Sequence, residues 1–165
     1  MKDLNSKDDK KLVAELDRAE KKGDISWVRP LLYAFRDRRE DEIREKMRQM
    51  LSTIKLSGAE GIYIDALEEG ECESIGAEIL GFLWSAGFDP SNKLDLITRI
   101  ATKGDFRAAM EGLTIVEQCE TIEEEHVLLE AILNVRSAIE GCQDDSLKAL
   151  YEPMLDALLK LERAQ

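Results

Sequence analysis

Few residues in this chain have the types and spacing that catalysis or metal binding requires. The only histidine, His126, falls in the first turn of an expected helix. We interpret it as a surface or packing residue, because a histidine that acts as a general base needs a suitably placed partner residue, and the sequence indicates none. Three cysteines, Cys72, Cys119 and Cys142, are odd in number and widely spaced, which indicates reduced thiols packed as small hydrophobic groups. The alternative, a metal site of Cys119, Cys142 and His126, lacks the spacing of a closed zinc site, so we predict no metal, cofactor or catalytic residue.

Recognised catalytic motifs are also missing from the sequence. It contains no Gly-x-Ser-x-Gly, no phosphate-binding loop and no dinucleotide-binding fingerprint. Its glycines fall singly at the ends of expected helices, where they act as C-caps rather than as a phosphate cradle. These features favour binding over catalysis, and an enzyme of unrecognised type stays as the alternative.

The net charge of −12 is unevenly distributed along the chain. Residues 1–55 hold 15 Lys and Arg against 12 Asp and Glu, whereas residues 56–165 hold 8 against 23. An acidic surface over two thirds of the chain repels nucleic acid and anionic membranes. We therefore expect a protein partner, and an anionic partner would have to meet the first third of the chain.

Two clusters of charged residues have the composition of docking patches. Four carboxylates in one loop form either a solvated turn or an acidic patch for a basic partner: Glu68, Glu69, Glu71 and Glu73. A basic run alternates with acidic residues, which indicates either a helix with i,i+4 ion pairs or a patch for an acidic partner. That run comprises Arg36, Arg38, Arg39, Arg44, Lys46 and Arg48. The candidate protein-binding residues taken from the two clusters are Arg36, Arg39, Glu69 and Glu71.

The two tryptophans are the most informative aromatic residues. Trp27 falls at the start of an expected helix and Trp84 near the end of another. Each is either a buried core residue or an exposed anchor on a binding groove, since tryptophan is enriched at interaction hot spots. Both are therefore candidate protein-binding residues.

The elements that must position these residues are helices. Apolar residues recur with a period of 3.6 throughout, as in Ile43, Met47, Met50, Leu51 and Ile54, and no segment alternates with a period of two. About nine helices joined by short loops are expected, and short loops make successive helices antiparallel neighbours. Asp105, Asp144 or Asp145, and a capping box of Thr121 and Glu124 are predicted to start helices. Pro153 is predicted to kink or divide the last one.

The start of the chain indicates where the protein works. Residues 1–7 lead into further charge rather than into an apolar stretch, so we do not expect them to be a secretory signal. No run approaches the roughly 20 apolar residues of a spanning helix. We expect a cytoplasmic protein that forms one helical-repeat domain over residues 1–165.

A weak internal repeat resembles a known family. Leu31-Leu32-x-x-Phe35-x-Asp37, followed by Ile43-Arg44-x-x-Met47-x-x-x-Leu51, is matched loosely about 32 residues later by Ala66-Leu67, Ile75, Ile79 and Leu83. The first stretch resembles a HEAT repeat, best over residues 24–55, with one extra residue between Asp37 and Ile43. The resemblance implies that Asp37 and Arg44 tie neighbouring units together.

This resemblance to HEAT and armadillo-type repeats implies a fold and a general role. The fold is an all-α, right-handed superhelix of about four antiparallel helix pairs, whose inner helices form a concave protein-binding surface. It implies no reaction: di-iron hydroxylases of this fold need repeated His-Glu pairs, which are missing, and its DNA glycosylases need a basic face. We predict a non-catalytic protein-interaction module or small scaffold, with a self-associating structural protein as the alternative.

Overall fold

The computed structural model describes residues 4–165, so Met1–Asp3, the first residues of the charged start, lie outside the described part. Within that part the chain forms nine α-helices and three short 3-10 turns, with no strand. The all-α prediction is thereby confirmed for residues 4–165. The chain divides into two compact units, residues 1–75 and 76–165.

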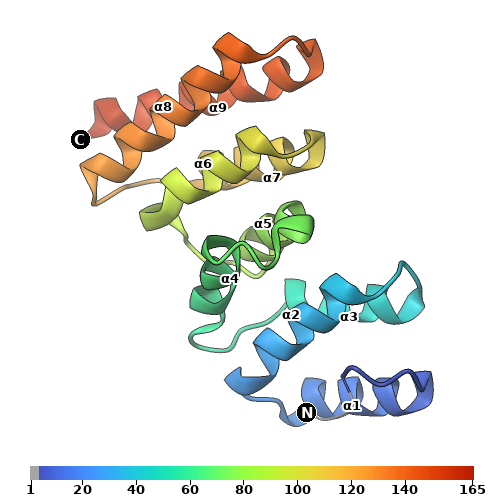
Figure 1. The fold of residues 1–165 in the computed structure, drawn as a ribbon. Helices are drawn as coiled ribbons and strands as arrows, with labels where there is room; N and C mark the ends of the chain where they lie inside the picture. The colour runs from blue at the N-terminus through green and yellow to red at the C-terminus, as the bar shows by residue number, and fades with distance from the viewer. Residues whose placement is uncertain (1–3) are drawn as a thin grey trace. The chain divides into compact units, whose positions relative to one another are not determined.

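The first unit packs four helices in two layers (Figure 1). They are α1 (Asp9–Lys22), α2 (Val28–Asp37), α3 (Glu42–Ser52) and α4 (Ala59–Glu68), with 3-10 turns at Ile25–Trp27 and Glu73–Ile75. α3 packs against α1 and α2, and α2 also packs against α4. The predicted apolar stripes supply the core, in which Phe35, Met47 and Leu51 are fully buried. Each such side chain stabilises the fold by about 1.5–3 kcal/mol.

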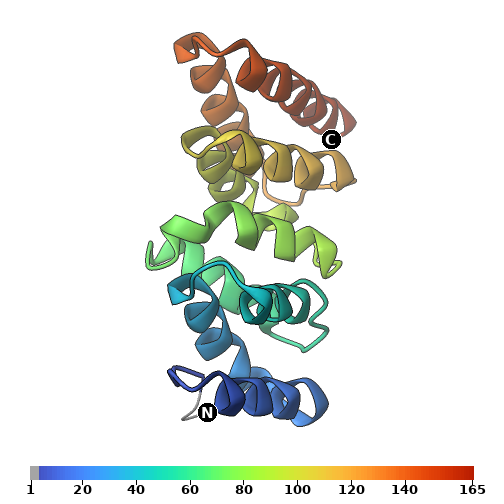
Figure 2. The same cartoon turned by 90° about the vertical axis from the view of Figure 1, so that its right-hand side faces the viewer.

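The second unit stacks two further helix pairs on one helix (Figures 1 and 2). Its helices are α5 (Gly76–Ser85), α6 (Leu94–Lys103), α7 (Phe106–Gln118), α8 (Glu125–Gly141) and α9 (Asp145–Ala164), with a 3-10 turn at Ser91–Lys93. α6 packs against α8 in one layer, while α5, α7 and α9 follow one another in the other layer. Short links join α6 to α7 and α8 to α9, which makes each pair antiparallel.

Close packing of the pair α6–α7 depends on a glycine that the sequence pattern alone does not explain. A Cβ at Gly112 on α7 would lie 2.4 Å from the Cβ of Ala101 on α6. Gly87, by contrast, follows α5 with φ 79°, the left-handed conformation expected of a glycine at a helix C-terminus. The single glycines therefore serve both as helix stops and as points of close approach.

Most predicted helix starts are correct, and one is wrong. Asp105 caps α7 by accepting from the N–H of Ala108 at 2.9 Å, and Asp144 caps α9. The capping box at Thr121 does not form: Glu124 occupies the N-cap position of α8 and makes no side-chain cap. Here an acidic residue at the positive end of the helix takes the place of a capping hydroxyl.

Pro153 lies inside α9 without dividing it. The helix runs from Asp145 to Ala164, so the predicted division does not occur. Proline removes one N–H donor from the helix, and burial of Tyr151, Met154 and Leu158 on the same helix offsets that loss. No described helix is both long enough and apolar enough to cross a membrane.

Candidate functional site

The acidic loop and the basic run meet each other within the first unit. Arg29 on α2 donates to the carboxylate of Glu69 at 2.7 Å. Arg36, two turns further along, donates to the backbone carbonyl of Glu71 at 2.9 Å, and the hydroxyl of Tyr33 donates to the carboxylate of Glu71. That carboxylate raises the pKa of Tyr33. Arg36, Glu69 and Glu71 therefore take part in contacts that fasten the segment after α4 onto α2.

The turn between α2 and α3 is held by a second set of internal contacts. Arg44 is buried, its guanidinium lies 4.0 Å from the ring centroid of Phe35, and its Nε donates to the carbonyl of Phe35 at 2.9 Å. Asp41 caps α3 by accepting from the N–H of Arg44 at 2.8 Å, and it pairs with Arg38 at 2.7 Å. The hydrogen bonds from Arg38 and then from the Arg44 backbone lower the pKa of Asp41 to about 2.

The remaining residues of the repeat motif and of the basic run lie around this turn. The carboxylate of Asp37 accepts from Arg36, its neighbour in sequence, at 2.6 Å. The carboxylates that reach Arg44 are those of Asp41, which accepts from its backbone N–H, and Glu40, which pairs with its guanidinium. Ile43 is half-buried at the start of α3. Arg39 is exposed, and among the described residues no hydrogen bond or ion pair engages it. Of the predicted basic candidates, Arg39 alone offers an unengaged guanidinium within residues 4–165.

Trp84 links two helices of the second unit. Its side chain is half-buried on α5, and its indole N–H donates to the carboxylate of Glu111 on α7 at 2.6 Å. Glu111 is only 9% exposed, and Nε of Arg107 lies 3.7 Å from it. Gly81 makes room for the pair, because a Cβ there would lie 3.1 Å from the Glu111 carboxylate. Trp84 thus takes a structural position rather than that of an exposed anchor.

Trp27 lies in an open groove of the first unit. It is half-buried, in the 3-10 turn between α1 and α2, and it lines a groove of about 310 Å³. The apolar part of the lining also contains Ala19, Val28, Leu31, Met50, Ile54 and Leu56. Charged residues at the same groove are Glu20, Asp24 and Lys55. The structure therefore gives Trp27 the surroundings of a hot-spot aromatic residue, an apolar hollow with a polar edge.

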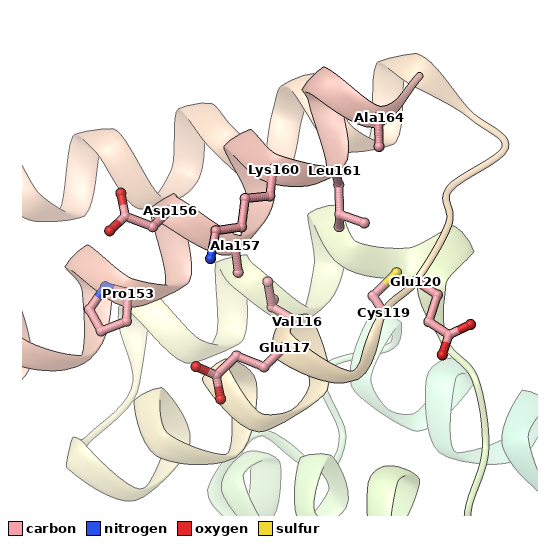
Figure 3. Close-up of a pocket in the computed structure, with 10 residues that line it drawn as sticks. All are labelled: Val116, Glu117, Cys119, Glu120, Pro153, Asp156, Ala157, Lys160, Leu161 and Ala164. Atoms are coloured by element: carbon pink, nitrogen blue, oxygen red, sulfur yellow. The ribbon is translucent and has the colours of Figure 1, made fainter.

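A larger groove, which was not among the predicted sites, lies between α7 and α9 (Figure 3). Its volume is about 450 Å³. The apolar lining consists of Val116, Cys119, Pro153, Ala157, Leu161 and Ala164. Four charged residues complete it: Glu117 and Glu120 from the α7 side, and Asp156 and Lys160 from α9.

The charged residues of this groove differ from those of the first unit. Across residues 4–165, no hydrogen bond or ion pair engages Glu117, Glu120, Asp156 or Lys160. Glu117 is the penultimate residue of α7 and Glu120 lies just beyond its end. Both carboxylates therefore lie near the negative end of the helix dipole, where acidic groups are disfavoured. Their placement contributes nothing evident to the stability of the fold.

The residues considered for metal chemistry lie at separate places. Cys119 follows α7 and donates to the carbonyl of Thr121 at 3.2 Å, while Cys142 follows α8 and donates to that of Asp144 at 3.3 Å. The imidazole of His126 is 75% exposed. In residues 4–165 no three His, Cys, Asp or Glu side chains gather as a metal site would require. Burial raises the pKa of the Cys119 thiol.

One pattern in the sequence of α9 is consistent with the groove between α7 and α9. Pro153, Ala157, Lys160 and Ala164 recur at i, i+4, i+7 and i+11, so they share one face of α9, and three of them are small. A face of small residues on a surface helix permits close approach of a neighbour. The α7 side of the groove has no comparable signal, since its pairing with α9 is a tertiary contact.

Comparison with protein families, with curated proteins and with solved structures finds no significant match for this chain.

Proposed function

We propose that this protein is a non-catalytic protein-interaction module, and that the groove around Trp27 receives an apolar segment of a partner protein. The observation that carries the proposal is the half-buried indole of Trp27 within an apolar hollow of about 310 Å³. Tryptophan at such a position supplies a large rigid contact surface and is enriched among the residues that dominate binding energy. The net charge of −12 further favours a protein over a nucleic acid or an anionic membrane as the partner.

The lining of the groove limits the kind of segment that fits it. Leu31 and Met50 contribute apolar surface, and Met50 adapts its shape easily to a ligand. The volume suits one or two apolar side chains of the partner, while Glu20 and Asp24 lie within reach of its polar backbone or a basic neighbour. No reacting group is required for this role.

Site-specific photo-crosslinking in cells tests the proposal. A benzoylphenylalanine in place of Lys55, at the groove, is expected to capture a defined partner protein, and Trp27→Ala in the same background is expected to abolish that product. Benzoylphenylalanine in place of Lys103, an exposed lysine of the second unit that lies in neither groove, provides the control. The proposal fails if the Lys55 product persists in the Trp27→Ala background, or if both positions capture the same proteins.

The architecture of the module is also proposed to be a HEAT-like solenoid of about four helix pairs, working in the cytoplasm. In support, α6 and α7 pair, α8 and α9 pair, and each helix of one pair packs on its counterpart in the next. Such helix-on-helix stacking is typical of α-solenoids. The charge-rich composition, 35% charged residues, favours the aqueous setting. An experimental structure of the chain would test the handedness and regularity of the stack.

Self-association is the second candidate function, favoured by an exposed apolar pair on α8. Leu129 and Leu133 lie one turn apart and are 42% and 59% exposed. Light scattering at high protein concentration is expected to report a dimer if this pair forms an interface, and Leu129→Ser with Leu133→Ser is expected to return it to a monomer. A monomer for the unmodified chain at all concentrations and at low salt would eliminate this candidate.

A further inference from the structure

We infer that the groove between α7 and α9 is a second docking surface, and that it receives a basic, amphipathic helical segment of another protein. This inference is independent of the Trp27 groove, which lies in the other unit. It rests on the shape of the groove, on its apolar lining and on the sign and placement of its charges.

The shape and lining of the groove suit a helix. It runs between two helices of the same layer, and a third helix packs into such a furrow by ridges-into-grooves contact. The α9 side presents Pro153, Ala157 and Ala164, whose small side chains allow a partner backbone to come close (Figure 3). Val116 and Leu161 supply the larger apolar contacts. A helix with one apolar face is the usual ligand of such a surface.

The charges specify a basic segment. Glu117, Glu120 and Asp156 contribute three carboxylates against the single ammonium group of Lys160. Residues 76–165 as a whole hold 8 Lys and Arg against 17 Asp and Glu, so the field around the groove also attracts a cationic partner. Lysine and arginine flanking the apolar face of a helix would meet these carboxylates, and charge complementarity of this kind fixes the partner and speeds its association.

The carboxylates of the groove are unfavourably placed for the stability of the fold, which indicates that they serve binding. Glu117 and Glu120 stand at the unfavourable end of the α7 dipole, and neither has an internal partner in residues 4–165. In the same helix, Glu111 shows what a structural carboxylate does: it is buried, accepts from Trp84 and lies near Arg107. Locally unfavourable groups that fold stability does not require are typical of binding sites.

The test uses a defined probe and the full chain. The probe is a fluorescein-labelled helical peptide of about four turns, with lysine on one face and leucine and alanine on the other. A second probe carries glutamate in place of lysine. Fluorescence anisotropy at low salt is expected to show binding of the lysine peptide alone, and the affinity is expected to fall as salt screens the charges.

Paired variants distinguish the groove from the general acidity of the chain. Glu117→Gln with Asp156→Asn is expected to weaken binding of the lysine peptide about tenfold. Glu130→Gln with Glu140→Gln makes the same change in net charge on the exposed surface of α8, and is expected to weaken binding by less than about twofold. Equal losses in the two double variants would overturn the inference and leave only diffuse attraction.

The apolar half of the groove has its own test, in which charge does not change. Ala157→Phe is expected to block the peptide, with a thermal melt to confirm that the variant folds. In the unmodified chain, bound peptide is expected to slow maleimide labelling of Cys119, which lines the groove, but not of Cys142, which does not. Binding to Ala157→Phe at the original affinity, together with unprotected Cys119, would overturn the inference.

Further results distinguish failure of this inference from failure of the proposed function. Trp27→Ala is expected to bind the lysine peptide normally, so loss of peptide binding in that variant would contradict a separate site in the second unit. If unlabelled copies of the chain itself displace the peptide, the groove serves self-association and the inference is overturned. Lack of peptide binding beside an intact Lys55 cross-link would sink this inference and leave the proposed function standing.

Discussion

Charged residues are used in opposite ways in the two units. In the first unit, Arg36, Arg44 and Glu71 form hydrogen bonds with groups of the same unit. The charged residues there hold neighbouring segments of the unit together. In the groove of the second unit, fewer charges stand beside apolar residues, and Glu117 and Asp156 have no partner within residues 4–165. The comparison shows that a dense run of charge in the sequence can be engaged within its own unit, whereas the few charges of the α7–α9 groove lie beside apolar residues without such partners in the described part of the chain.

The largest effect on stability is expected from Arg44, the most deeply buried of the basic residues around the turn between α2 and α3. Arg44→Ala removes its stacking on Phe35 and the hydrogen bond from its Nε to the carbonyl of Phe35. Loss of that packing and of a buried hydrogen bond is expected to lower the free energy of unfolding by about 2–3 kcal/mol, measured by urea unfolding. Arg39→Ala, in the same turn but exposed, is expected to change it by less than about 0.5 kcal/mol. Equal effects would contradict the assignment of Arg44 as a fastening residue.

A matched pair of glutamates on α7 sharpens the comparison within one helix. Glu111→Ala leaves the indole N–H of Trp84 without its acceptor and is expected to lower the free energy of unfolding by about 2 kcal/mol. Glu117→Ala, six residues further along, is expected to leave stability within about 0.5 kcal/mol. Urea unfolding followed by circular dichroism measures both, and a destabilised Glu117→Ala would show that the groove carboxylate is structural after all.

These contrasts show how much of the molecule could be predicted from its sequence. Apolar periodicity predicts the helices, and Asp105 and Asp144 predict where two of them begin. Thr121 fails as a cap, because the helix begins further along the chain, with Glu124 at its N-cap position. The position of Trp27 at a helix start and its aromatic type were enough to nominate it.

The groove between α7 and α9 could not be predicted in the same way. Its two sides come from segments about 40 residues apart in sequence, and only packing brings Val116 near Ala157. Likewise, nothing local tells that Arg36 donates to Glu71, 35 residues away, rather than to a partner protein. Local sequence specifies the helices and their caps, whereas the group with which each charged side chain pairs depends on tertiary contacts.

Asp41 makes the stability of the first unit dependent on pH. Its pKa is lowered to about 2 by Arg38 and the Arg44 backbone, so the ionised form stabilises the fold fully above about pH 4. This contribution is lost as the pH falls from about 4 through about 2. Asp41→Asn keeps a capping oxygen but not the charge, so its stability deficit is expected to shrink over that window in urea unfolding. Asp41→Ala, which also loses the cap, is expected to cost about 1–2 kcal/mol at neutral pH.

The smallest expected effect has the opposite sign. Neutralising Glu117 and Asp156 removes an acidic group from the unfavourable end of α7 and reduces repulsion in an acidic unit. The double variant Glu117→Gln with Asp156→Asn is therefore expected to gain about 0.3–1 kcal/mol in the free energy of unfolding. A loss of similar size, measured by thermal and urea unfolding, would mean that these carboxylates stabilise the fold.

The central claim is that partners bind in the grooves and not to the basic run of the first unit. Parallel affinity purification from the protein's own cells, with quantitative mass spectrometry, tests it most directly. The forms compared are the unmodified chain, Trp27→Ala, Glu117→Gln with Asp156→Asn, and Arg39→Ala. The account predicts that each groove variant loses specific proteins that Arg39→Ala retains. Loss of the same proteins in Arg39→Ala, with full retention in both groove variants, would contradict it.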